Sequence, residues 1–131
     1  MKSIMFVCKQ NSCRSQMAEG FAKTIGQGKV SVTSSGLAKS EVNPTAVIVM
    51  QEIGIDISEQ SSKALNDFNA EDYDAVVSLC GCGVNLPSDW VTREIFADWQ
   101  LDDPAGHPIE VFRRVRDEIK ERVTDLIEQI N

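Results

Sequence analysis

The first 25 residues combine a short apolar run, a polar loop and an amphipathic segment, and this order constrains the fold more than any other feature. Ser3–Val7 is apolar and is followed by polar residues, which predicts a buried strand. From Ser15 the apolar residues fall at helical spacing, and Gly26 and Gly28 follow where a helix would end. The stripe consists of Met17, Ala18, Phe21, Ala22 and Ile25. A strand that leads through a loop into a helix is typical of α/β folds.

The rest of the chain continues this alternation. Asn43 and Pro44 suit the start of a second helix, which ends at Gly54, and Pro108 opens a long last helix. Further strands are predicted over Val30–Ser34, Asp74–Leu79 and Val91–Phe96. The order β-α-β-α-β-β-α predicts a parallel α/β sheet flanked by helices on both faces. Ligands of such sheets bind at the carboxyl ends of the strands.

Composition narrows the classes of protein. The chain has 131 residues, 42% of them hydrophobic, and no repeat or linker divides it, so we predict a single domain over residues 1–131. The net charge of −7 disfavours nucleic acid and membranes as partners. The apolar start is too short for a signal peptide, which predicts a soluble, cytoplasmic protein. Four cysteines in such a chain indicate catalytic, redox or metal-binding roles rather than structural disulfides.

Cys8 stands where the first predicted strand ends, and the segment from Cys8 to Ser15 has the form Cys-x5-Arg-Ser. A short loop that enters a helix can turn its N–H groups inward, and the helix N-terminus adds a partial positive charge. This suits a tetrahedral oxyanion, which Arg14 can hold with two hydrogen bonds. The same field stabilises a thiolate, so Cys8 is placed as a nucleophile. The predicted oxyanion loop consists of Lys9, Gln10, Asn11, Ser12, Cys13, Arg14 and Ser15.

The alternative for this segment is a buried thiol at a strand end and a solvated arginine, because a cysteine and an arginine at this spacing also occur by chance. The strand-loop-helix context favours the oxyanion loop. Cys13 is expected to pack under the loop and is given no catalytic role.

Asp102 and Asp103 precede Pro104, after the predicted fourth strand. A cysteine that cleaves a phosphate ester needs a general acid for the leaving group, and a carboxylate over the pocket could supply it. Two acids ahead of a proline turn are also common, and spacing alone does not decide between these interpretations.

Together, Cys8-x5-Arg14-Ser15, Gln16 to Gly20 and Asp103 to Gly106 resemble the low-molecular-weight protein tyrosine phosphatases, and more closely the arsenate reductases built on that fold. The resemblance covers nearly the whole chain and implies a four-stranded parallel sheet. It also implies that Cys8 is the nucleophile, Arg14 the oxyanion clamp, Ser15 the thiolate partner and Asp103 the general acid. The phosphatases usually carry aromatic residues after their Asp-Pro, whereas Ala105 and Gly106 follow here.

The reductase branch needs further cysteines after the third strand, and Cys80-Gly81-Cys82 supplies them. The resemblance implies a relay in which Cys80 attacks Cys8, arsenite leaves, and Cys82 then attacks Cys80. An external glutathione, glutaredoxin or thioredoxin donor would reduce the final disulfide. Thioredoxin-coupled reductases space these two cysteines further apart, and the short spacing favours glutathione or glutaredoxin. The alternatives are two inert cysteines, or a metal site with Cys8 or His107, which a Cys-x-Cys pair fits poorly.

Three hypotheses follow. The first is an arsenate reductase of arsenic detoxification that uses Cys8, Cys80 and Cys82, with no bound cofactor or metal and with residual phosphatase activity. The second is a tyrosine phosphatase that uses Cys8, Arg14 and Asp103 alone. The third is a non-enzymatic thiol protein that binds arsenite or a metal. Some relatives bind potassium near the loop, but Lys63 stands where an acid would complete that site, so we expect no tight potassium site here.

Overall fold

The computed structural model describes residues 1–79 and 86–130. Four strands, β1 (Lys2–Cys8), β2 (Val30–Gly36), β3 (Ala75–Ser78) and β4 (Ile95–Asp98), form one sheet in the order β2-β1-β3-β4. Every neighbouring pair is parallel. The helices are α1 (Arg14–Ile25), α2 (Pro44–Gln51), α3 (Ser88–Val91) and α4 (Ile109–Ile130), with short 3-10 turns over Leu65–Asp67 and Ala70–Asp72. The predicted α/β fold with a four-stranded parallel sheet is confirmed.

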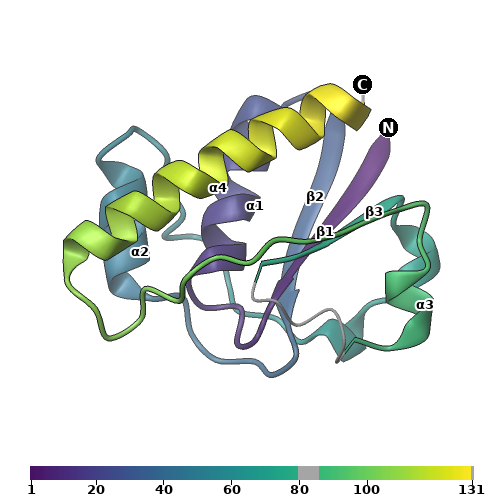
Figure 1. Ribbon diagram of the computed structural model, residues 1–131, viewed down its shortest axis with the longest axis horizontal. Helices are drawn as coiled ribbons and strands as arrows, with labels where there is room; N and C mark the ends of the chain where they lie inside the picture. Colours follow the sequence, from purple (N-terminus) through teal and green to yellow (C-terminus); the bar gives the residue numbers. More distant parts are fainter. Residues whose placement is uncertain (80–85, 131) are drawn as a thin grey trace.

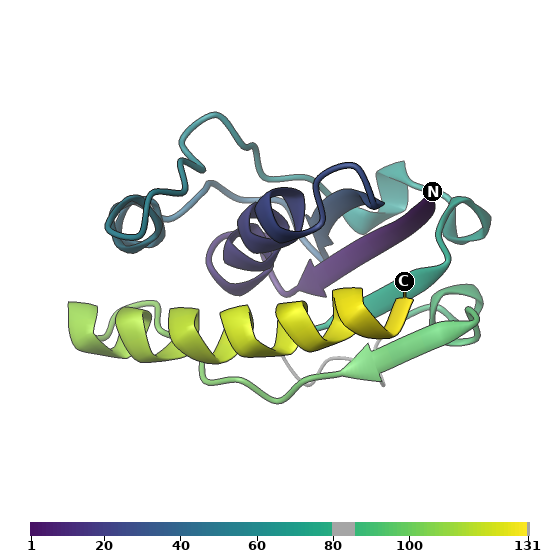
Figure 2. The same cartoon turned by 90° about the horizontal axis from the view of Figure 1, so that it is seen from above.

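The helices cover the two faces of the sheet unequally (Figures 1 and 2). Ile4 and Phe6 of β1 belong to a large core cluster with α1, α2 and α4. Met5 and Val7 point to the opposite face, where they pack with Tyr73 and other residues around the 3-10 turns and α3. Both faces of β1 are therefore buried, as the continuous apolar run predicts.

The helices begin and end at the residues that the sequence predicts for α1, α2 and α4, within a few positions. Asn43 accepts a hydrogen bond from the amide of Thr45 at 2.8 Å and so caps α2, with Pro44 as its first residue. Gly26 ends α1. The last helix, α4, begins directly after Pro108, and its buried stripe faces α1 and α2. Among the described residues, no helix is both long and apolar enough to cross a membrane.

The predicted fourth strand, Val91–Phe96, is displaced in the structure. Val91 ends the short helix α3, and β4 begins only at Ile95. Pro87 immediately precedes α3, where a proline suits the start of a helical turn, and the hydroxyl of Thr92 donates to the carbonyl oxygen of Ser88 at 2.8 Å where the turn ends. The turn buries Trp90 against the smaller core cluster. Tertiary burial therefore overrides the β-propensity of Val91.

The topology gathers the ends of the strands at one edge of the sheet. Cys8 pairs with Gly36 at the carboxyl ends of β1 and β2. The amide of Leu79, just after β3, donates to the carbonyl oxygen of Val7 at 2.9 Å. The loop from Cys8 to Arg14 therefore lies beside the ends of both neighbouring strands, where a parallel sheet places its ligand site.

Candidate active site

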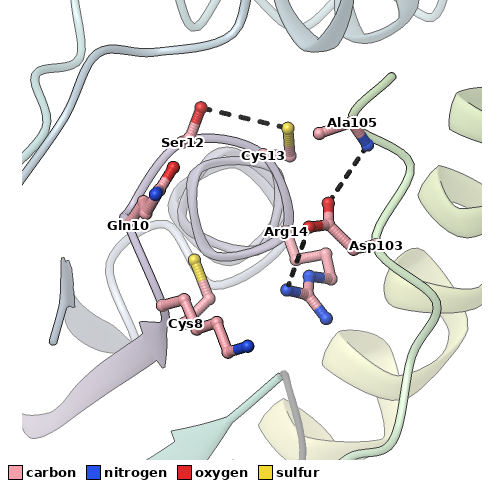
Figure 3. Close-up of a pocket in the computed structure, with 8 residues that line it drawn as sticks. Cys8, Gln10, Ser12, Cys13, Arg14, Asp103 and Ala105 are labelled. Carbon is pink, nitrogen blue, oxygen red and sulfur yellow. Dashed lines mark hydrogen bonds and ion pairs between the residues drawn. The ribbon is translucent and has the colours of Figure 1, made fainter. Parts of the chain in front are cut away.

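A small cavity of about 130 Å³ opens at this edge of the sheet (Figure 3). The residues that line it come from the predicted oxyanion loop and from the loop after β4. They are Cys8, Lys9, Gln10, Ser12, Cys13, Arg14, Asp103 and Ala105. The structure thus brings Asp103 to the cysteine and the arginine across about 90 positions of sequence.

The backbone of the loop is turned so that its carbonyl groups point away from the cavity. The oxygens of Cys8 and Lys9 accept from the amides of Leu37 and Ala38, and that of Ser12 accepts from the amide of Asn43, at 2.9–3.1 Å. The carbonyl oxygens of Gln10 and Asn11 accept from side chains, each at 3.0 Å. Because the C=O and the following N–H of a planar trans peptide point in opposite directions, the loop amides are directed inward. This is the geometry of an anion-binding nest.

The thiol of Cys8 lies at one end of a chain of hydrogen bonds. Its Sγ is 2.8 Å from the Ser15 Oγ, and that oxygen also accepts from the Nδ2 of Asn11 at 2.8 Å. Since the Ser15 oxygen accepts from Asn11, its own proton is available to Sγ. Ser15 can therefore stabilise the sulfur as a thiolate, which is the role that the resemblance implies.

Asn11 holds the centre of the loop in a left-handed conformation, with φ of 51°. The side-chain Nδ2 of Asn11 also donates to the Oγ of Ser34 at 2.9 Å. Its Oδ1 accepts from the backbone amide of Lys63 at 2.8 Å. The loop lies so close to β2 that a Cβ at Gly36 would come within 2.6 Å of the Asn11 nitrogen. Only glycine fits there, which explains why β2 ends in Gly36.

The hydrogen-bond chain ends at a buried carboxylate. The hydroxyl of Ser34 donates to Glu19, whose other oxygen binds the ammonium of Lys23. The Nζ of Lys63 lies 3.5 Å from the same Glu19 carboxylate. Two lysines thus compensate the charge of Glu19. The absence of a tight potassium site stays a prediction.

Arg14 is buried, and its guanidinium contacts two other segments, one at Leu79 and one from Leu101 to Asp103. Its Nη1 donates to the carbonyl oxygens of Leu101, at 2.9 Å, and Leu79, at 3.3 Å. Its Nη2 lies 3.8 Å from Oδ2 of Asp103 (Figure 3). The backbone contacts hold the planar group in place at the cavity, where the rest of it can bind an oxyanion.

The carboxylate of Asp103 is about half exposed, and its Oδ1 accepts from the amide of Ala105 at 3.1 Å. Ala105 offers only a methyl group to the wall of the cavity, and none of the described residues that line it is aromatic. His107 lies in the exposed turn before α4. Cys80 and Cys82 lie outside the described residues.

Cys13 lines the cavity but is buried, and this burial raises the pKa of its thiol to about 11. The neighbouring charges of Asp103 and Cys8 act in the same direction. Below that pH the thiol stays protonated and is a poor nucleophile, which agrees with the expectation that Cys13 only packs in the loop.

The sequence around this cavity belongs to a known protein family. The sequence pattern of the low molecular weight phosphotyrosine protein phosphatases matches residues 3–131. The chain belongs to this family. It is 66% identical to the glutaredoxin arsenate reductase of Synechocystis sp. over 131 residues, with full coverage of both chains. It is 47% identical to an arsenate reductase of Staphylococcus aureus over 91% of each chain.

Solved structures of similar proteins have the same fold as this chain. An arsenate reductase in a phosphate-binding state matches with a TM-score of 0.96 and 66% identity, with both chains fully covered. The resemblance to the arsenate reductases of this family, expected from the cysteine loop and the Asp-Pro segment, is confirmed.

The residues that hold the oxyanion loop and Arg14 in place are harder to predict from the sequence than Cys8 and Arg14 themselves. Asn11 is predicted as a residue of the oxyanion loop, and the resemblance to relatives further implies that Asn11 and Glu19 help to hold that loop. The sequence does not predict the contacts of Ser34, Gln60 and the carbonyl groups of Leu79 and Leu101. A backbone carbonyl has no sequence signature, and Ser34 and Gln60 are distant in sequence from their partners Asn11 and Gln16. The one available signal for Ser34 is the small, polar Ser-Ser-Gly end of an alternating strand.

Proposed function

We propose that this protein reduces arsenate to arsenite with Cys8 as the nucleophile, and so serves arsenic detoxification. The observation that carries the proposal is the Cys8 sulfur, 2.8 Å from the Ser15 hydroxyl, in a cavity bordered by inward amides and Arg14. Arsenate is a tetrahedral oxyanion of the kind that such a loop binds. The full-length relatives named as arsenate reductases support the choice of arsenate over other oxyanions.

In the first step the Cys8 thiolate attacks arsenic(V), and an arsenic-bound oxygen leaves as water after protonation. Asp103, beside Arg14 at the cavity, is proposed as the acid that donates this proton. The product is a thiol-arsenate adduct on Cys8. Arg14 and the loop amides balance the negative charge of its remaining oxygens.

In the second step a thiolate of Cys80 attacks the Cys8 sulfur. A disulfide forms, the sulfur-arsenic bond breaks, and its electron pair leaves with arsenic, which becomes arsenite. Cys82 then attacks Cys80 and returns Cys8 as a thiolate. The carboxyl end of β3 lies beside that of β1, and Leu79 immediately precedes Cys80 in the sequence, which supports Cys80 as the attacking thiol.

The Cys80–Cys82 disulfide then needs two electrons from outside the protein. A dithiol donor of the glutaredoxin or thioredoxin type, or two molecules of glutathione, would supply them. The relative from Synechocystis is named a glutaredoxin arsenate reductase, which favours glutaredoxin with glutathione as the donor.

Residual phosphatase activity is the second candidate. The half-exposed carboxylate of Asp103, 3.8 Å from Arg14, favours it because a phosphate ester needs such an acid. Ala105 provides no ring against an aryl group, so aryl phosphates should be poor substrates. A non-enzymatic thiol protein has no need for the oxyanion loop and is disfavoured for that reason.

The direct test is arsenite production by the purified protein with glutathione plus glutaredoxin, or with thioredoxin and its reductase. Cys8→Ser, Cys80→Ser and Cys82→Ser should each abolish multiple turnover. Full activity of Cys8→Ser would refute the proposal.

A further inference from the structure

Two side-chain amides connect the oxyanion loop to the segment Gln60–Lys63, and neither takes part in the proposed chemistry. Gln16, in the first turn of α1, is fully buried. Its Nε2 lies 3.0 Å from the carbonyl oxygen of Asn11, 2.9 Å from the Asn11 Oδ1 and 2.9 Å from the carbonyl oxygen of Ser61. Gln60 in turn places its Nε2 2.8 Å from the Gln16 Oε1 and 3.0 Å from the Gln16 carbonyl oxygen.

These amides can point in only one direction. The backbone oxygens of Asn11 and Ser61 accept and cannot donate, so Gln16 must present its NH₂ group to them. Its own Oε1 then faces Gln60, which must present its NH₂ group in turn. The result is a one-way chain of donors from Gln60 through Gln16 to Asn11.

The same segment contacts the loop at two further points. The hydroxyl of Ser62 donates to the carbonyl oxygen of Gln10 at 3.0 Å, and the amide of Lys63 donates to the Asn11 side chain at 2.8 Å. The carbonyl oxygens of two consecutive loop residues, Gln10 and Asn11, are therefore held outward by groups of the segment or by Gln16. The amides that follow those carbonyls are the ones directed at the cavity.

We propose that Gln60, acting through Gln16, is a positioning residue that holds the oxyanion loop in its binding conformation before an oxyanion arrives. The proposal rests on the proposed function only in taking the loop as the oxyanion site. Asparagine tolerates the left-handed conformation better than most residues do, and the bonds to its backbone and side-chain oxygens select that conformation over the extended one.

This role predicts a particular kinetic signature. Without the Gln60 donors the empty loop would populate other conformations, and binding would have to select the competent one. Affinity for an oxyanion should fall, whereas an oxyanion that is bound restores the same geometry around Cys8. The KM for arsenate should rise while kcat is nearly unchanged.

The test uses Gln60→Met, which keeps the length of the side chain and removes its donors, with Gln51→Met on the exposed surface of α2 as the matched control. Calorimetric titration with inorganic phosphate should show a Kd about three- to tenfold higher for Gln60→Met, because loss of the two Gln60 hydrogen bonds removes part of the preorganisation of the loop. Amide hydrogen exchange of residues 9–15 should be faster in the phosphate-free variant and return to the wild-type rate at saturating phosphate. A wild-type Kd for Gln60→Met would overturn the proposal.

Gln60→Glu provides a second, independent variant. As a carboxylate it would face two acceptor oxygens of Gln16, whereas the protonated acid can donate one hydrogen bond again. The ratio of its phosphate Kd to that of the wild type should therefore be larger at about pH 7 than at about pH 4, below the ordinary glutamate pKa of about 4.3. A Kd ratio that does not change with pH would contradict the positioning role of Gln60. If Gln60→Met fails to fold, the pH dependence of Gln60→Glu tests the proposal by itself. Phosphate binding is measured without arsenate, so a failure here is distinct from a failure of the reductase assignment.

Discussion

The Nη1 of Arg14 donates to the carbonyl oxygen of Leu101 at 2.9 Å and so connects the oxyanion loop to the segment that carries Asp103. The same nitrogen lies 3.3 Å from the carbonyl oxygen of Leu79. One guanidinium thus holds the ends of three chain segments together at the cavity. Its planar shape allows it to keep these contacts and still present N–H groups to an oxyanion.

Arg14→Lys should therefore lose most activity although the charge is kept. A lysine ammonium cannot reproduce both the backbone contacts and a two-pronged grip on the substrate. We expect kcat/KM for arsenate to fall by about 100-fold or more, as for the loss of an oxyanion donor in other enzymes. Steady-state kinetics measure this, and a rate near that of the wild type would remove the clamp assignment.

Asp103→Asn should abolish most of the residual phosphatase activity. An amide cannot donate a proton to a poor leaving group, so hydrolysis of phenyl phosphate should fall by about 100-fold. Asp102→Asn is the matched control, because Asp102 is exposed and forms an ion pair with Arg114 outside the cavity. Equal losses in the two variants would show that Asp103 has no special role.

Cys13 should make the folded state less stable at high pH. Its pKa in the folded protein is about 11, above the ordinary value of 9.0, because burial disfavours the thiolate. The stabilising effect of the neutral buried thiol is complete below the ordinary pKa and is lost as pH rises from about 9 to about 11. Urea unfolding should show a steeper loss of stability over this range for the wild type than for Cys13→Ala. Parallel pH profiles would contradict this.

Gly36→Ala should damage both the fold and the oxyanion loop. The added Cβ would lie 2.6 Å from the backbone of both Asn11 and Ala38. We expect a loss of about 1–3 kcal/mol of stability, typical of overpacking, together with weaker phosphate binding.

Gly28→Ala is the control for that substitution. Gly28 has a φ of 79° but no atom near its Cβ position, so alanine there should reduce stability and leave phosphate affinity unchanged. Loss of phosphate affinity in both variants would indicate a general effect of instability rather than a local one.

The reacting residues could be predicted from the sequence because a local pattern carries them. Cys8 and Arg14 lie within one strand-loop-helix unit, whose apolar periodicity is visible without the structure. Asp103 needed a resemblance to relatives, since nothing local distinguishes it from Asp102. The supporting network could not be predicted, because Gln60 contacts Gln16 from 44 positions away and Ser34 contacts Asn11 from 23 positions away, and both are ordinary polar residues in sequence.

Single-turnover chemistry of Cys82→Ser tests the central claim most directly. Arsenate reduction at Cys8 needs only one further thiol, so this variant, mixed with arsenate and no donor, should release about one equivalent of arsenite and stop. Mass mapping should then find a disulfide between Cys8 and Cys80. Absence of arsenite, or repeated turnover of Cys82→Ser with either protein donor, would contradict the relay.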